Sequence, residues 1–174
     1  VYPTDTYSGL GASGYSREAI DNIYQLKRRD KDKPLSLVIS DLRMLETIAR
    51  DLPPVLPELA QKFWPGALTV IVNASPDLPG NLMGTRKTIG VRVPDHAWLR
   101  QLIQRAGFPL PATSANLSGG KEIRIPDEAV SLFNGKVDLI VNGGNTRGGL
   151  SSTVLDLCAS PVRILREGAV PRRE

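Results

Sequence analysis

Two cations near the end of an expected helix are the first residues in this sequence whose types and spacing suggest chemistry. They are Lys27 and Arg29, in the run KRRDKDKP at residues 27–34. Arginine offers a forked pair of donors and lysine a compact charge, so both suit phosphate or carboxylate oxygens. Because they are two positions apart, they can reach one ligand only where the helix ends. The alternative is a solvated helix end, where cations complement the helix dipole.

A second candidate is Arg92, which lies within the apolar run at residues 88–93. An arginine in such a strand costs free energy if it is buried without a partner. It is therefore either a clamp for a carboxylate or an edge-strand side chain that faces water, and the residues alone favour neither.

The third candidate is the segment LPATSANLSGG at residues 110–120. It begins as a buried strand would and then becomes a run of hydroxyl, amide and glycine residues. Small residues let a ligand approach the backbone, and open α/β sheets bind ligands where such loops leave strands. The segment predicts either a ligand-binding loop or a simple strand-to-helix turn. Similar loops at residues 4–13 and 142–151 could contribute to one site.

Several familiar kinds of site do not fit the composition. The chain has one cysteine, Cys158, and one histidine, His96, which excludes an internal disulfide and argues against a zinc site. It has neither a P-loop nor the glycine fingerprint of a Rossmann fold. We identify no metal-binding side chains, no general base and no nucleophilic triad. What remains is an anion site that works by positioning and charge neutralisation, as nucleotidyl transfer does.

Length, charge and hydrophobicity describe an ordinary globular protein. The 174 residues have a net charge of +4 and are 41% hydrophobic, which suits one domain spanning residues 1–174 and favours anionic partners. No apolar run could cross a membrane, and the lone cysteine fits a reducing compartment, so we expect a cytoplasmic protein. Val1-Tyr2-Pro3 reads as the end of a strand, and we expect that strand to be truncated.

Helical and strand patterns alternate along the chain, which predicts an α/β fold with a mixed parallel and antiparallel sheet. Capping residues and apolar periodicity predict helices at residues 16–28, 41–49, 55–63, 96–106 and 126–133. Apolar runs predict strands at residues 35–39, 67–72, 88–93, 137–141, 153–157 and 162–165, with a further strand starting at residue 110.

Four motifs, in order and spacing, resemble those of the YrdC-like family of threonylcarbamoyl-AMP synthases. They are YPTDTYSGLG at residues 2–11, Lys27-x-Arg29 followed by KPL at 33–35, FWPGALT at 63–69, and SANLSG at 114–119. VRVP at 91–94, STVLD at 152–156 and ILREGA at 164–169 add to the match. The resemblance covers essentially the whole chain and implies the short, single-domain type of the family.

The resemblance implies a twisted mixed sheet with flanking helices around a large basic cavity. It also implies that L-threonine and bicarbonate give N-carboxythreonine, which attacks the α-phosphate of ATP to give threonylcarbamoyl-AMP and pyrophosphate. The expected activity is that of an L-threonylcarbamoyladenylate synthase, a nucleotidyltransferase, with Mg²⁺ accompanying the ATP. A separate complex would then transfer the threonylcarbamoyl group to tRNA.

The resemblance assigns roles by position. The matching catalytic residues are Lys27, Arg29, Ser114 and Asn116. The matching threonine-binding residues are Thr6, Arg92, Ala112 and Ser152, with Arg92 as the carboxylate clamp. The matching ATP-binding residues are Arg29, Lys33, Thr88, Ser114, Glu122 and Arg166.

Three positions depart from the family pattern. Ser8 stands where glycine is usual, Val38 where some members have histidine, and Glu122 where serine is common. If the nucleotide contact at residue 122 uses the backbone, the glutamate side chain does not matter.

Two other functions are consistent with the residues. A basic module of the same fold could bind tRNA or double-stranded RNA without catalysis, which the net charge and the arginine-rich residues 163–173 support. A paralogue could act on another carbamoyl-type substrate, although Ser114, Asn116 and the threonine-side residues argue against it.

Overall fold

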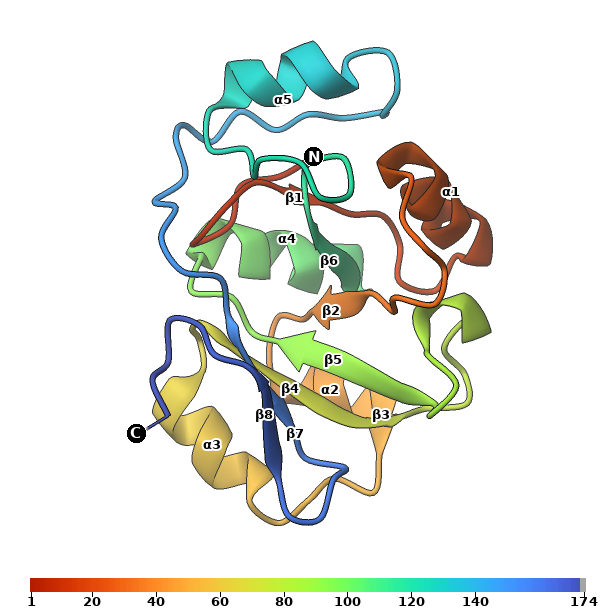
Figure 1. The fold of residues 1–174 in the computed structure, drawn as a ribbon, viewed down its shortest axis with the longest axis vertical. Helices are drawn as coiled ribbons and strands as arrows, with labels where there is room; N and C mark the ends of the chain where they lie inside the picture. Colours follow the sequence, from red (N-terminus) through yellow and green to blue (C-terminus); the bar gives the residue numbers. More distant parts are fainter. Residues whose placement is uncertain (173–174) are drawn as a thin grey trace.

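One eight-stranded mixed sheet runs through residues 1–172, the part of the chain that this computed structural model describes (Figure 1). Its strands are ordered β1-β6-β2-β5-β4-β7-β8, and β3 pairs with β4 beside this path. The strands are β1 (Gly9–Leu10), β2 (Ser36–Val38), β3 (Ala49–Arg50), β4 (Leu68–Ala74), β5 (Thr88–Arg92), β6 (Leu110–Ser114), β7 (Thr153–Asp156) and β8 (Arg163–Arg166). The helices are α1 (Arg17–Lys27), α2 (Leu42–Ile48), α3 (Leu56–Phe63), α4 (Ala97–Ala106) and α5 (Pro126–Phe133), with a 3-10 turn, η1, at Gly80–Leu82.

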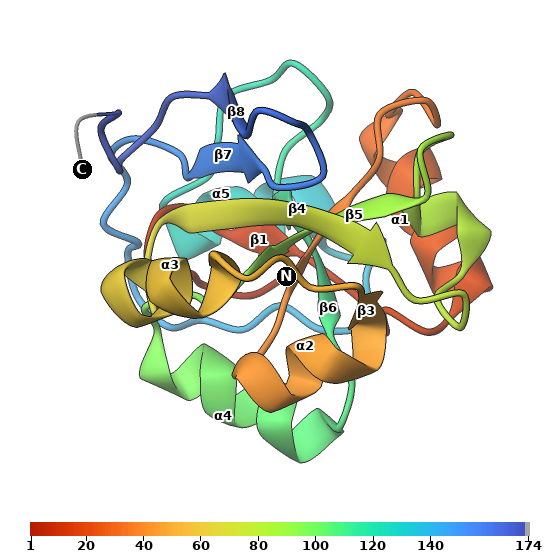
Figure 2. The ribbon, with the colours of Figure 1, turned by 90° about the horizontal axis from the view of Figure 1, so that it is seen from below.

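The sheet is mixed, as predicted. β2 runs parallel to β5 and β4 runs parallel to β7, whereas the other neighbouring pairs are antiparallel. In Figure 2 the sheet curls, so that β7 and β8 lie on one side of β4 while α2, α3 and α4 lie on the other. Among the described residues, no helix is long and apolar enough to cross a membrane.

Capping residues set the ends of two helices. Ser16 precedes α1, and its hydroxyl accepts a hydrogen bond from the backbone of Ala19 at 3.2 Å. α1 ends at Lys27 because Arg28 adopts a left-handed conformation, with φ of 51°. α4 ends in the same way at Gly107, with φ of 73°, where glycine permits this conformation without strain. Both predicted helices are therefore confirmed.

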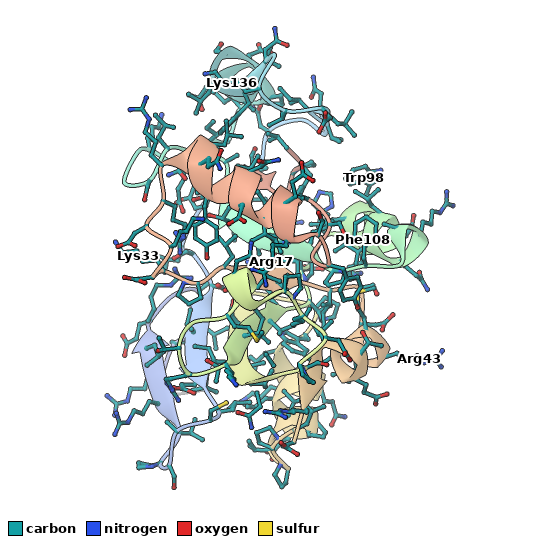
Figure 3. The ribbon with its side chains drawn as sticks, turned by 90° about the vertical axis from the view of Figure 1, so that its right-hand side faces the viewer. Arg17, Lys33, Arg43, Trp98, Phe108 and Lys136 are labelled. Carbon is teal, nitrogen blue, oxygen red and sulfur yellow. The ribbon has the colours of Figure 1, made fainter. Side chains whose placement is uncertain are left out.

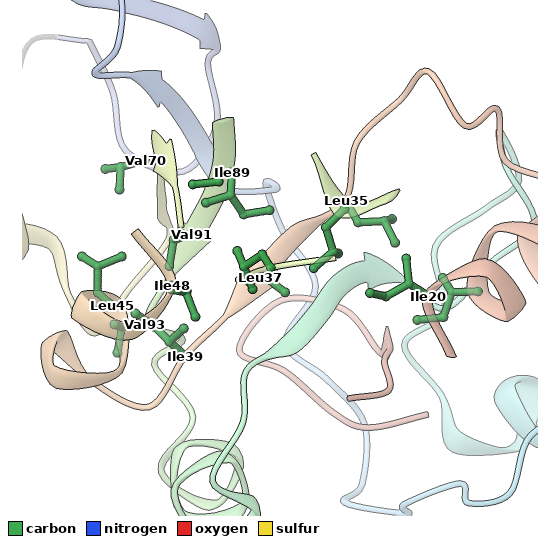
Figure 4. Packing of buried hydrophobic residues seen from close by; sticks show 14 of the residues in the cluster. Ile20, Leu35, Leu37, Ile39, Leu45, Ile48, Val70, Ile89, Val91 and Val93 are labelled. Carbon is green, nitrogen blue, oxygen red and sulfur yellow. The ribbon is translucent and has the colours of Figure 1, made fainter. Parts of the chain in front are cut away.

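Alternation along the strands separates an apolar core from a polar face. In β5, Ile89 and Val91 enter the core, whereas Arg92 lies on the opposite face. Figure 4 shows these core side chains together with Leu45 and Ile48 of α2. The same pattern recurs in and beside β2 and β4, with core positions Leu35, Leu37, Ile39, Leu68, Val70 and Val72 and polar-face positions Ser36 and Thr69.

Part of the sheet differs from the sequence-based prediction. The strand predicted at residues 137–141 is wrong, because the described residues give this run only two backbone hydrogen bonds of the inter-strand kind. The Val1 ammonium donates to the Leu139 carbonyl at 2.7 Å, and the Val141 N–H donates to the Val1 carbonyl at 2.9 Å. β1 and β3 were not predicted, since two-residue strands carry no alternation. The other predicted strands and helices are present, with ends shifted by at most two residues.

Candidate active site

A cavity of about 260 Å³ lies on the polar face of the sheet, lined by strand residues and by residues of the loops before β1, after α1 and before β7. Eight of the site residues predicted from the sequence line it, although they come from distant parts of the chain. These eight are Thr6, Arg29, Arg92, Ala112, Ser114, Glu122, Ser152 and Arg166. The structure therefore brings most of the predicted site together around one space.

Four predicted site residues lie outside the cavity lining. Lys27 and Asn116 are buried behind it. Lys33 is exposed on the loop that follows α1, on the opposite side of the molecule from Trp98 (Figure 3). Thr88 opens β5 and is half-buried. The ligand contacts of these four residues stay predictions.

Lys27 is a buried cation that has no carboxylate partner among the described residues. Its side chain is 1% exposed. The ammonium donates to three neutral oxygens, the carbonyls of Ser114 and Asn116 at 2.5 and 2.6 Å and Asn116 Oδ1 at 2.9 Å. Burial lowers the pKa of Lys27 from 10.5 to about 8, assisted by Arg29 and opposed by Glu122. The charge is held in place by dipoles but is not neutralised.

The loop after β6 is organised by the same contacts. Ser114 Oγ donates to Asn116 Oδ1 at 2.7 Å, and the Asn116 amide donates to the Gly120 carbonyl at 2.5 Å. The Ser118 N–H donates to the Lys27 carbonyl at 2.9 Å, which ties the loop to the end of α1. Because the Ser114 proton is used within the loop, the Ser114 hydroxyl presents lone pairs to the cavity.

The left-handed Arg28 redirects the chain, so that Arg29 reaches the cavity while Lys27 stays behind it. Arg29 Nε donates to the Lys33 carbonyl at 3.0 Å, and Nη2 donates to the Pro34 carbonyl at 3.1 Å. These acceptors are neutral, so Arg29 also keeps its full charge. The helix ends between the two cations, as their spacing required, and a fully solvated helix end is the wrong interpretation for this pair.

Arg92 is buried in the middle of the sheet and is paired with a carboxylate. Nη2 donates to Asp5 Oδ2 at 2.5 Å, Nε donates to the Gly66 carbonyl at 2.7 Å, and neither charged side chain is more than 10% exposed. Burial lowers the pKa of Arg92, and Asp5 opposes that shift. Asp5 Oδ1 is buried without a hydrogen-bond partner among the described residues. The interpretation of Arg92 as a water-facing edge residue is therefore wrong.

Asp5 is a site residue that the sequence reasoning missed. It stands between two threonines in the hydroxyl-rich loop, which is the signal that could have marked it, since an isolated carboxylate there needs a cation. Its partner lies 87 positions away, so no local pattern joins the two.

Arg166 and Ser152 connect two parts of the cavity. Arg166 donates to the Ser152 carbonyl through Nε at 3.1 Å and through Nη2 at 2.8 Å, and Nη2 also donates to Ser152 Oγ at 3.1 Å. The Ser152 hydroxyl lies 2.8 Å from that of Thr69, which the sequence reasoning gave no role. A position predicted to bind threonine is thus in direct contact with one predicted to bind ATP.

The charges around the cavity favour an anionic ligand. Arg29, Arg92 and Arg166 line it, and Glu122 is the one lining carboxylate among the described residues. No group of three or more histidine, cysteine, aspartate or glutamate side chains within residues 1–172 could hold a metal ion. This lining suits a molecule with several anionic groups.

Comparison with known proteins identifies the family of this site. The Sua5_yciO_yrdC family model, described as "Telomere recombination", matches residues 1–168. The chain belongs to the Sua5/YciO/YrdC family. The resemblance inferred from the four motifs is therefore confirmed, and most of the residues that line the cavity come from those motifs and from the segments that add to the match.

Members of the Sua5/YciO/YrdC family match the chain from end to end. A relative from Pyrococcus abyssi, named threonylcarbamoyl-AMP synthase, is 37% identical over 174 residues, which cover 100% of this chain and 51% of the relative. A relative of the same name from Bacillus subtilis is 37% identical over 176 residues, with the same two coverages. The crystal structure of P. abyssi Sua5 complexed with L-threonine matches with a TM-score of 0.94 at 37% identity, covering 99% of this chain and 51% of that chain. The chain spans about half the length of these relatives, and the match confirms the predicted YrdC-like fold.

Proposed function

We propose that the chain is an L-threonylcarbamoyladenylate synthase, a nucleotidyltransferase that converts L-threonine, bicarbonate and ATP into threonylcarbamoyl-AMP and pyrophosphate. One observation carries the proposal: the whole chain matches a solved Sua5 structure that holds L-threonine, and its own cavity gathers the motif residues around a buried arginine. The two relatives named threonylcarbamoyl-AMP synthase support the same reaction.

The amino-acid half of the site is organised around Arg92. Its guanidinium already donates to protein oxygens through Nε and one Nη2 proton. Its remaining donors therefore bind the carboxylate of threonine. Thr6, Ser152 and Ala112 line the same cavity, and in this proposal Thr6, Ser152 and the backbone at Ala112 hold the rest of the amino acid. Val38 is one of the apolar residues of the cavity lining, at the position where the resemblance places histidine in some members of the family.

The nucleotide half is organised around Arg29 and Arg166. Both guanidiniums have donors left over from their contacts with carbonyl oxygens, and both suit phosphate oxygens. Ser114 presents lone pairs and suits a hydroxyl or amino donor of the nucleotide. The remaining ATP-binding residues of the proposal are Lys33, Thr88 and Glu122.

Mg²⁺ enters this proposal with the ATP. The ion prefers oxygen ligands and commonly binds through substrate phosphates and water with one or two carboxylates. The cavity lining, with Glu122 as its one carboxylate among the described residues, fits that mode, and Glu122 would hold the ion on the protein side. When bound, the ion supplies charge neutralisation on the leaving pyrophosphate.

The reaction proceeds in two balanced steps. The neutral amine of threonine attacks the carbon of bicarbonate and releases water, which leaves N-carboxythreonine. A carbamate oxygen then attacks the α-phosphorus, and the bond from that phosphorus to the bridging oxygen of pyrophosphate breaks. Carboxylate, carbamate and triphosphate crowd together in this step, so fixed cations lower its barrier by offsetting their repulsion. Lys27 acts mainly through its charge and through the loop it holds, and Asn116 acts through the same loop.

The product implies the partners and the compartment. The threonylcarbamoyl group is passed to tRNA by a separate transfer complex, and the arginines that line the cavity also favour contact with RNA. We place the proposed reaction in the cytoplasm, where tRNA is modified and a lone thiol stays reduced.

An assay of pyrophosphate release tests the proposed reaction directly. The complete mixture of ATP, L-threonine and bicarbonate should release pyrophosphate, and omission of threonine or of bicarbonate should each abolish release. Release that needs neither substrate, or no release from a folded sample, would contradict the proposal. If the protein is instead an RNA-binding module without catalysis, it should release no pyrophosphate. It should bind tRNA with an affinity that falls steeply as the salt concentration rises.

A further inference from the structure

Thr69 is buried at the cavity although neither the motif nor the proposed function gives it a role. It lies in β4, is 4% exposed and lines the cavity on the polar face of the sheet. Its neighbours Leu68 and Val70 point the other way, into the core. The position would accept valine if burial alone mattered, because valine has the same shape and a higher preference for strands.

A count of protons explains the hydroxyl at this position. Ser152 Oγ accepts a hydrogen bond from Arg166 Nη2, since a guanidinium can only donate. The hydroxyls of Thr69 and Ser152 lie 2.8 Å apart, so one of them donates to the other. Whichever donates, one hydroxyl proton of the pair is left over, and no other described residue accepts it. Because both residues line the cavity, that proton is available to a ligand oxygen.

The pair is also fixed to a cation. Arg166 makes three hydrogen bonds to Ser152, two to its carbonyl and one to its hydroxyl. Arg92 is near enough to Arg166 for the two charges to act on each other. The free hydroxyl proton therefore lies in a positive field, where an anionic oxygen of the ligand is the acceptor that fits best.

We infer that Thr69 is a positioning residue, which orients Ser152 and its bond to Arg166 and so couples the amino-acid half of the site to the nucleotide half. This inference rests on the proposed function and deepens it. Without the Thr69 hydroxyl, Ser152 Oγ keeps only its hydrogen bond from Arg166 Nη2, so the hydroxyl proton presented to the amino acid is less firmly oriented. When nucleotide phosphates bind Arg166 in such a variant, they then fix the orientation of Ser152 less firmly, so threonine affinity responds less to the nucleotide.

Calorimetric titration of L-threonine tests the inference on the whole chain, with and without α,β-methylene-ATP, whose bridging carbon blocks the reaction. In the unmodified protein the analogue should tighten threonine binding, and Thr69→Val should weaken threonine binding about 5-fold and remove most of that tightening. Thr69→Ser keeps the hydroxyl and should restore both. Thr47→Val removes a hydroxyl from the exposed side of α2 and serves as the matched control.

A double-mutant cycle separates positioning from an independent contact. If Thr69 acts through Ser152, Thr69→Val should add no further loss in a Ser152→Ala background. Additive losses, or a Thr69→Val variant that binds like the unmodified chain, would overturn the inference. An unmodified chain that binds no threonine would instead overturn the proposed function, and the inference with it. Unchanged thermal midpoints would establish that each variant folds.

Discussion

Two buried cations of the site, Lys27 behind the cavity and Arg92 in its lining, are held in opposite ways. Lys27 donates to three neutral oxygens, and no carboxylate of the described chain meets it. Arg92 is neutralised by Asp5 in a buried ion pair. The Lys27 side therefore projects net positive charge, which suits several phosphates. The Arg92 side has little net charge but presents hydrogen-bond donors in a fixed orientation, which suits a single carboxylate.

Removal of Asp5 should have the largest effect on stability. Asp5→Ala leaves Arg92 charged, buried and without its anion, and the loss of one partner from a buried pair costs about 3–5 kcal/mol. Urea denaturation monitored by tryptophan fluorescence measures the change. The double variant Asp5→Ala/Arg92→Met removes both charges and should recover at least half of the lost stability. An Asp5→Ala midpoint equal to that of the unmodified chain would contradict the buried-pair description.

Lys27→Met should abolish most of the activity while stability changes less. The variant keeps the length of the side chain but removes the charge, and the loss of one electrostatic contact in an active site typically costs about 10²- to 10³-fold in rate. Pyrophosphate release under saturating substrates measures it. The matched control is Lys121→Met, which removes an exposed charge next to the loop after β6 that Lys27 holds. This control should retain full activity. Equal activity in both variants would remove the reason for distinguishing the two sides.

The lowered pKa of Lys27 predicts a pH dependence for nucleotide binding. The group is charged below its pKa of about 8 and neutral above it, so affinity for α,β-methylene-ATP should be constant at low pH and weaken as pH rises through 8. A loss of about tenfold between pH 7 and 9.5 is expected, since one charge on an anion in a partly buried site contributes on this scale. The pH dependence should be absent from Lys27→Met, and its persistence there would assign it to another group.

The smallest effect on stability and activity is expected at an exposed ion pair between α1 and the loop that follows it. Lys31 Nζ lies 3.1 Å from Asp21, but its side chain is 67% exposed, so water and salt screen the pair. Lys31→Ala should leave the urea midpoint and pyrophosphate release unchanged within error. A measurable loss would mean that charge on the exposed loop after α1, and not only in the cavity, guides the ligand.

Features set by neighbouring residues could be predicted from the sequence, and features set by distant ones could not. Ser16 and Gly107 mark helix ends, and strand alternation predicts which residues face the core, because these depend on a few consecutive positions. The run at 137–141 has the composition of a strand, but strand formation needs a partner, and the described chain offers it only Val1. The Asp5–Arg92 pair has no local signature at all.

The chain order of these contacts has a consequence for synthesis. The pairs that build the cavity span 89 positions from Lys27 to Asn116, 87 from Asp5 to Arg92 and 83 from Thr69 to Ser152. A nascent chain that has not yet emerged from the ribosome as far as Arg166 lacks one wall of the cavity, whatever helices it has already formed. The proposed ligands can therefore bind only after the chain has emerged as far as Arg166, and a shorter fragment would lack a complete cavity.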